Sequence, residues 1–92
     1  MARYLMLGKY SYEAVKGIKA ERTKKVEKVI KDAGGKVEAM YALLGSFDLA
    51  FIVEFPSEAE VMAASIAITK LTGIGFTTLP AIEVEKFDRL VG

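Results

Sequence analysis

The pattern of hydrophobic and polar positions divides the chain into six segments. Four are apolar runs bounded by Gly, Pro or Ser, which is typical of β-strands. Between them lie two stretches in which apolar residues recur every three or four positions, which predicts helices. In chain order we predict a strand at 3–10, a helix at 11–33, strands at 36–44 and 49–55, a helix at 57–72 and a strand at 76–84.

Local signals mark where these segments begin and end. Ser11 is placed to cap the first helix, and Gly34-Gly35 ends it, since Gly takes a left-handed conformation at little cost. Ser57 and Glu60 form a capping box at the start of the second helix. Pro80 makes the last strand an edge strand or an interrupted one. Residues 85–92 are predicted to be a short polar tail with at most one helical turn.

This order of elements predicts the fold. Two right-handed crossovers joined by a hairpin give a four-stranded antiparallel sheet with both helices on one face. The result is a ferredoxin-like βαββαβ sandwich of the α+β class. The 92 residues leave room for one domain, which spans 1–92.

Apolar residues lie on both faces of the predicted sheet. The strand 49–55 places Ala50 and Ile52 opposite its main apolar face, where a sheet covered on one side only should be polar. We therefore expect the free face to bury a homodimer interface. Met62 and Ile66 lie off the main stripe of the second helix, which predicts a second contact and an assembly larger than a dimer.

Composition limits the chemistry. The chain has no Cys and no His, so we expect no disulfide, metal site, haem or other cofactor. Its net charge of +1 argues against nucleic-acid binding. No segment is long enough to span a membrane or reads as a targeting signal, so we expect a cytoplasmic protein. Asn and Gln are also absent while Lys and Glu are abundant, a thermophile-like bias.

An ordered set of motifs resembles the GYD-domain family. The motifs are a Tyr-rich first strand, Arg22, Gly34-Gly35-Lys36-Val37, Leu44-Gly45-x-x-Asp48, Glu54-Phe55-Pro56 and Gly73. Phe47 stands where the family usually has the Tyr of its Gly-Tyr-Asp motif. The resemblance implies a single GYD-like domain that pairs as a dimeric α+β barrel, with two ferredoxin-like sheets face to face. It implies no established biochemical activity.

The hairpin turn and its charged neighbours are the candidate ligand-binding site. Gly45 permits the turn, and Asp48 can accept its amide hydrogens beside Phe47. Arg22 falls on the apolar stripe of the first helix, where a guanidinium needs a partner. Glu54 lies in an otherwise apolar strand. The same residues also suit a purely structural role, in which Asp48 closes the hairpin and an Arg–carboxylate pair pins helix to sheet.

Three functions fit the sequence. The first is a homodimer or larger homo-oligomer that binds a small molecule or serves as a scaffold. The second is a cofactor-free enzyme that uses Asp, Glu, Tyr and Lys for acid-base chemistry. The third is a purely structural assembly module. Whether the chain is an enzyme is left open.

Overall fold

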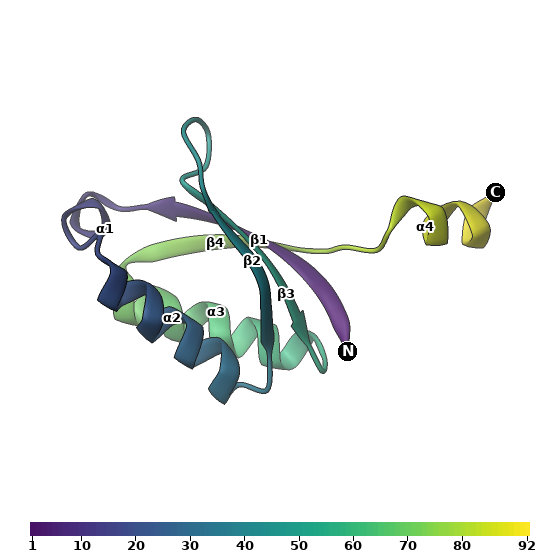
Figure 1. The fold of residues 1–92 in the computed structure, drawn as a ribbon, viewed down its shortest axis with the longest axis horizontal. Coiled ribbons are helices and arrows are strands. Elements are labelled where there is room, and N and C mark those ends of the chain that lie inside the picture. Colours follow the sequence, from purple (N-terminus) through teal and green to yellow (C-terminus); the bar gives the residue numbers. More distant parts are fainter.

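The strands of the computed structural model, which describes residues 1–92, form one antiparallel sheet in the order β2-β3-β1-β4. Helices α2 and α3 lie on the same side of this sheet (Figure 1). The predicted ferredoxin-like α+β fold is confirmed. The elements are β1 (Ala2–Tyr10), α1 (Tyr12–Lys16), α2 (Ala20–Asp32), β2 (Lys36–Ala42), β3 (Leu49–Phe55), α3 (Glu58–Thr72), β4 (Ile74–Pro80) and α4 (Val84–Val91).

The core lies between the sheet and the two long helices. Because side chains alternate along a strand, β1 and β3 each send every second residue toward the helices. Met6, Val53 and Phe55 have no exposed surface, and Tyr4 packs edge-on against the Phe55 ring. From the helices, the apolar stripes predicted by their spacing contribute Val26, Ile30, Val61, Ala64 and Ile68.

No helix packs on the other face of the sheet, and α4 stands clear of it (Figure 1). Leu5 on β1 is paired with Ile52 on β3 and with Leu79 on β4, so apolar side chains adjoin across three strands. Leu7 and Ala50 extend the same row. These residues are half-buried or exposed. We call this surface the open face.

The first helix is broken, and the prediction of a continuous helix over 11–33 was wrong. Ser11 does cap its start by accepting a hydrogen bond from the Ala14 amide. The break follows Lys16: the Gly17 amide donates back to the Ala14 carbonyl at 3.2 Å, and Arg22 donates to the same oxygen. That carbonyl would receive the Ile18 amide in a continuous α-helix. A tertiary contact thus takes the acceptor that the helix needed, at a Gly of low helix propensity.

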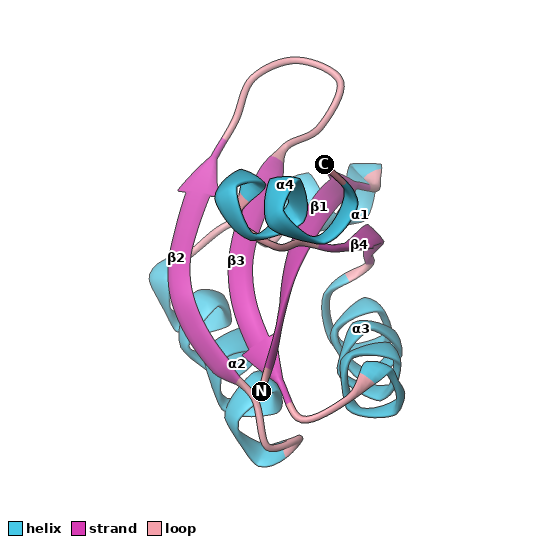
Figure 2. Cartoon of the chain, turned by 90° about the vertical axis from the view of Figure 1, so that its right-hand side faces the viewer, coloured by secondary structure: helices cyan, strands magenta, loops and turns pink.

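The strands β2 and β4 also differ from prediction in where they begin or end. β2 ends at Ala42 rather than Leu44, because the chain leaves the sheet to form the hairpin loop, which projects clear of the strands (Figure 2). β4 occupies Ile74–Pro80 instead of 76–84. Gly73, with φ of +78°, ends α3 in one residue, so the strand starts at once. Pro80 has no amide hydrogen to donate and is the last residue of the strand.

The C-terminal residues form a helix instead of a polar tail. α4 lies beyond the end of the sheet, apart from α2 and α3 (Figure 1). None of its residues is buried. It adds two turns of helix to the fold that the element order predicts.

Candidate functional site

Asp48 ties the hairpin to the end of β1. Its carboxylate accepts a hydrogen bond from the Tyr10 amide at 2.7 Å, and its own amide donates to the Gly8 carbonyl at 2.8 Å. Phe47 beside it is half-buried, while Gly45 is exposed in the loop with φ of +145°. The contacts of Asp48 fix the direction in which the chain leaves β1.

Arg22 approaches the same end of β1 from the helix side. Its guanidinium donates to the Ala14 carbonyl and stacks over the Tyr10 ring, with 5.5 Å between the guanidinium carbon and the ring centroid. Arg22 and Asp48 therefore meet at Tyr10, one at its ring and one at its amide. The Ala14 carbonyl, which would accept from the Ile18 amide in a continuous helix, holds Arg22 in place.

A cavity of about 320 Å³ opens beside Arg22, between the start of α2 and the sheet. Tyr10 and Tyr41 border it, and its only charged lining residues are Lys19 and Arg22. Both charges are positive. Ten of its 13 lining residues are hydrophobic, among them Ile18, Val26, Met40, Leu49, Phe51 and Ile74.

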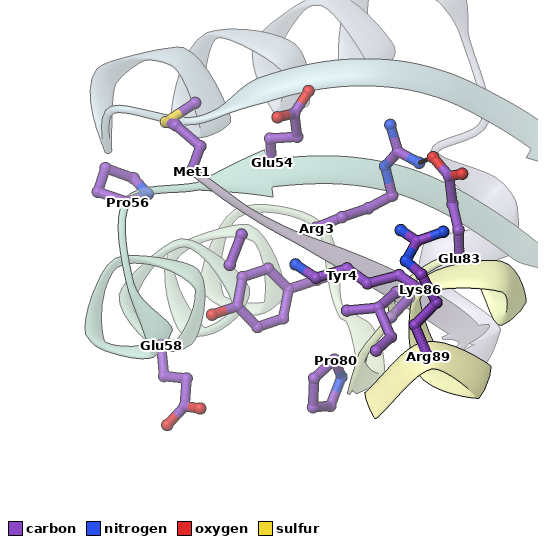
Figure 3. Close-up of a pocket in the computed structure, with 13 residues that line it drawn as sticks. Met1, Arg3, Tyr4, Glu54, Pro56, Glu58, Pro80, Glu83, Lys86 and Arg89 are labelled. Atoms are coloured by element: carbon purple, nitrogen blue, oxygen red, sulfur yellow. Dashed lines mark ion pairs between the residues drawn. The ribbon is translucent and has the colours of Figure 1, made fainter. Parts of the chain in front are cut away.

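Glu54 does not join Arg22. It lies on the open face, where Arg3 and Lys36 are its partners in register on the neighbouring strands. It lines a larger groove of about 640 Å³ between the N-terminal end of β1 and α4. Figure 3 shows this groove, with Arg3, Glu83, Lys86 and Arg89 around it. Of the predicted site residues, Arg22 lines the cavity and Glu54 lines the groove, while Gly45, Phe47 and Asp48 line neither.

Surface ion pairs of Arg3 connect β1 to β2 and to the segment before α4 at the groove beside Glu54. Arg3 Nε lies 2.8 Å from Glu38 Oε2, and a second guanidinium nitrogen lies 3.8 Å from Glu83. The hydrogen bond with Glu54 and the Arg3 guanidinium lower the pKa of the Glu38 carboxyl below its ordinary value of 4.5. Three basic and three acidic side chains line the groove, so its charge favours neither an anionic nor a cationic ligand.

The apolar cavity was not predicted from the sequence. That Tyr10 and Lys19 line it was not predicted either. In the sequence Tyr10 stands only as the last residue of the strand predicted at 3–10. The sequence signal that could have drawn attention to Tyr10 is an aromatic residue at the end of a strand, directly before the helix cap Ser11. Lys19 could not be placed while the helix was taken as continuous, since the break brings it to the mouth of the cavity.

Two further features bear on the chemistry. No three acidic side chains are grouped so that they could hold a metal ion. None of the helices has the length and apolar character needed to cross a membrane.

The fold defines a class, small antiparallel α+β domains of ferredoxin-like topology. The Mycobacterium tuberculosis leucine response regulatory protein has a similar fold, with a TM-score of 0.59 and 8% sequence identity. The match covers 89% of this chain and 51% of that one, so the chain spans about half the length of that protein. The GYD-domain family model matches residues 4–91, and the chain belongs to that family. A search of curated proteins finds no match.

Proposed function

We propose that this chain is a self-associating domain that binds a small apolar anion, such as a carboxylate, in the cavity beside Arg22. The observation that carries the proposal is an apolar cavity bordered by two cations and by no acidic side chain. Such a lining can hold the apolar body of a ligand against its hydrophobic walls and the negative group of the same ligand beside the two cations. Asp48 then supports the site from the hairpin side through Tyr10, while Gly45, Phe47 and Glu54 lie outside it.

The apolar wall supports binding of a small ligand. Val26 and Phe51 belong to the buried core, so the floor of the cavity is a rigid surface rather than a mobile loop. Ligand pockets in proteins range from about 300 to 1,000 Å³. At about 320 Å³ the cavity suits a ligand at the small end of that range.

Arg22 supports recognition of an anion. Its recorded hydrogen bond uses one terminal nitrogen, and the Tyr10 ring supports the guanidinium plane, so other N–H groups remain to bind a carboxylate. The first turn of α2 borders the cavity without a side-chain cap on its amides, and a helix N-terminus favours negative charge. No acidic side chain lines the cavity to repel an anion.

The open face supports self-association. Leu5, Leu7 and Ile52 form a continuous apolar row with no element above it. The similar fold in a protein named for its response to leucine, which has an apolar side chain and a carboxylate, fits ligand binding by a domain of this kind. The ligand and the dimer are separate parts of the proposal.

Titration calorimetry with matched ligand pairs tests the ligand. We expect 4-methylpentanoate or benzoate to bind, and the corresponding neutral amides to bind at least tenfold more weakly. A hydrogen bond to a charged group contributes about 1.5–3 kcal/mol. The Arg22→Met variant should therefore raise Kd about 10- to 100-fold. The matched control Lys31→Met, which removes an exposed cation from the same helix, should bind as the wild type does.

The variant Arg22→Lys guards against a trivial loss of structure. It keeps the positive charge and should retain part of the affinity, and circular dichroism should show both Arg22 variants folded. The ligand proposal fails if no carboxylate binds, if amides bind as tightly as carboxylates, or if folded Arg22→Met binds like the wild type.

A further inference from the structure

The eight residues of α4 separate into an apolar side and a charged side. At about 100° per residue, Val84, Phe87, Leu90 and Val91 fall within one arc of about 120°. Glu85, Lys86, Asp88 and Arg89 fill the rest of the helix surface, where Arg89 pairs with Glu85 at 3.1 Å. So complete a separation is the pattern of a helix that packs one side against a protein surface.

No surface of its own chain receives this apolar side. Phe87 is 51% exposed and Leu90 is 68% exposed. The segment before the helix is nevertheless held in place: the Ala81 amide donates to the Arg3 carbonyl at 3.0 Å, and Glu83 lies near the Arg3 guanidinium. Figure 3 shows Glu83 beside Arg3, where the chain passes from β4 to α4. They direct α4 outward, beyond the end of the sheet.

The size of the exposed surface indicates what is missing. The chain exposes 6105 Å², whereas a compact monomer of 10.0 kDa exposes about 5,200 Å². The excess of roughly 900 Å² is close to the ~800 Å² that each partner buries in an interface of standard size. The radius of gyration is 13.7 Å, against about 12 Å for a compact chain of this length.

We infer that α4 is an arm that packs its apolar side against a second copy of this chain, as an extension of the proposed dimer interface. The inference rests on the proposed self-association. In a two-fold dimer formed through the open face, the α4 of each copy would project past its own sheet toward its partner, and each arm would bury Phe87 and Leu90 there. The excess exposed surface of the single chain would then be buried in the dimer, partly on the open face and partly on α4.

The charges of α4 favour a second copy over a lipid surface. Helices that lie on membranes are rich in Lys and Arg on the polar side. The polar side of α4 has two acidic and two basic residues, so it has no net attraction to anionic lipid. An isolated helix of eight residues is also unstable in water without a packing surface.

Sedimentation equilibrium of paired variants tests the arm. The double variant Phe87→Ser with Leu90→Ser removes the apolar side, and the control Lys86→Ser with Asp88→Ser changes the polar side at constant net charge. We expect the first to raise the dimer Kd at least 100-fold and the second to change it less than threefold. Because α4 buries nothing in its own chain, the apolar variant should melt like the wild type at concentrations where both are monomers.

Each other outcome overturns the inference in a distinguishable way. If the apolar variant dimerises like the wild type, the arm is wrong while self-association stands. If it lowers the Tm of the monomer, α4 packs against its own chain. If the wild type is a monomer that sediments with phosphatidylglycerol vesicles, a lipid surface is the partner. A wild type that is monomeric at every concentration and ignores vesicles refutes both the arm and the dimer.

Discussion

The two faces of the sheet are made from the same strands but differ in what covers them. On the helix side, Met6 and Val53 have no exposed surface. On the open face, Leu5 and Ile52 adjoin them in sequence, yet nothing packs above them. The helix side accounts for the stability of one chain, and the open face offers apolar area that one chain leaves unused.

The same contrast separates the two kinds of helix. α2 and α3 bury Ile30 and Ile68 completely, whereas α4 buries none of its residues. Apolar residues on a strand or helix therefore do not by themselves say which chain they pack against. The position of the element in the fold indicates its packing partner. α2 and α3 are joined to the sheet by crossovers that return over it, whereas α4 follows a segment that leads away from the sheet.

The sharpest test of the contrast compares Phe55→Ala with Ile52→Ala. Phe55 has no exposed surface, so its truncation should cost about 3–5 kcal/mol of unfolding free energy at any protein concentration. Ile52→Ala should cost far less in the monomer and should become more destabilising as the protein concentration rises into the dimer range. Chemical denaturation at several protein concentrations measures both effects. Equal, concentration-independent losses would remove the distinction between the two faces.

A smaller effect concerns the charged end of the open face. The pKa of Glu38 is lower in the folded chain than in the unfolded chain, so at acid pH the unfolded chain binds more protons. The stability from this group is present above pH 4.5 and is lost as the pH falls through the folded pKa. The Glu38→Gln variant should therefore show a weaker loss of stability between pH 5 and about pH 3, measured by thermal melts. The control Glu58→Gln, at an exposed site, should keep the wild-type slope.

The strands and the core could be predicted because alternation and helical spacing are local signals. Phe55, Met6 and Ile68 all lie on the apolar faces that those periods define. The break in the first helix could not be predicted in the same way. At the break, the Ala14 carbonyl accepts hydrogen bonds from the Gly17 amide and from Arg22, eight residues away, and the periodicity of the sequence does not reveal such a contact.

The site was predictable in part. Arg22 and Asp48 were placed on an apolar helix stripe and at a hairpin, and both contact Tyr10. Glu54 was grouped with them although strand alternation sets it on the face opposite Phe55, away from the helices. That parity was visible in the sequence. The cavity itself was not, because it exists only where the helix break exposes part of the core.

The central claim, that the open face is an interface between two copies, is tested most directly by the mass of the protein in solution. We predict that sedimentation equilibrium at micromolar concentration gives at least twice the 10.0 kDa of one chain. Ile52→Lys, which sets a charge in the middle of the open face, should give the mass of one folded chain, while the control Ser46→Lys in the exposed hairpin loop should remain dimeric. A wild type that sediments as a single chain, or an Ile52→Lys variant that is still a dimer, would contradict the account.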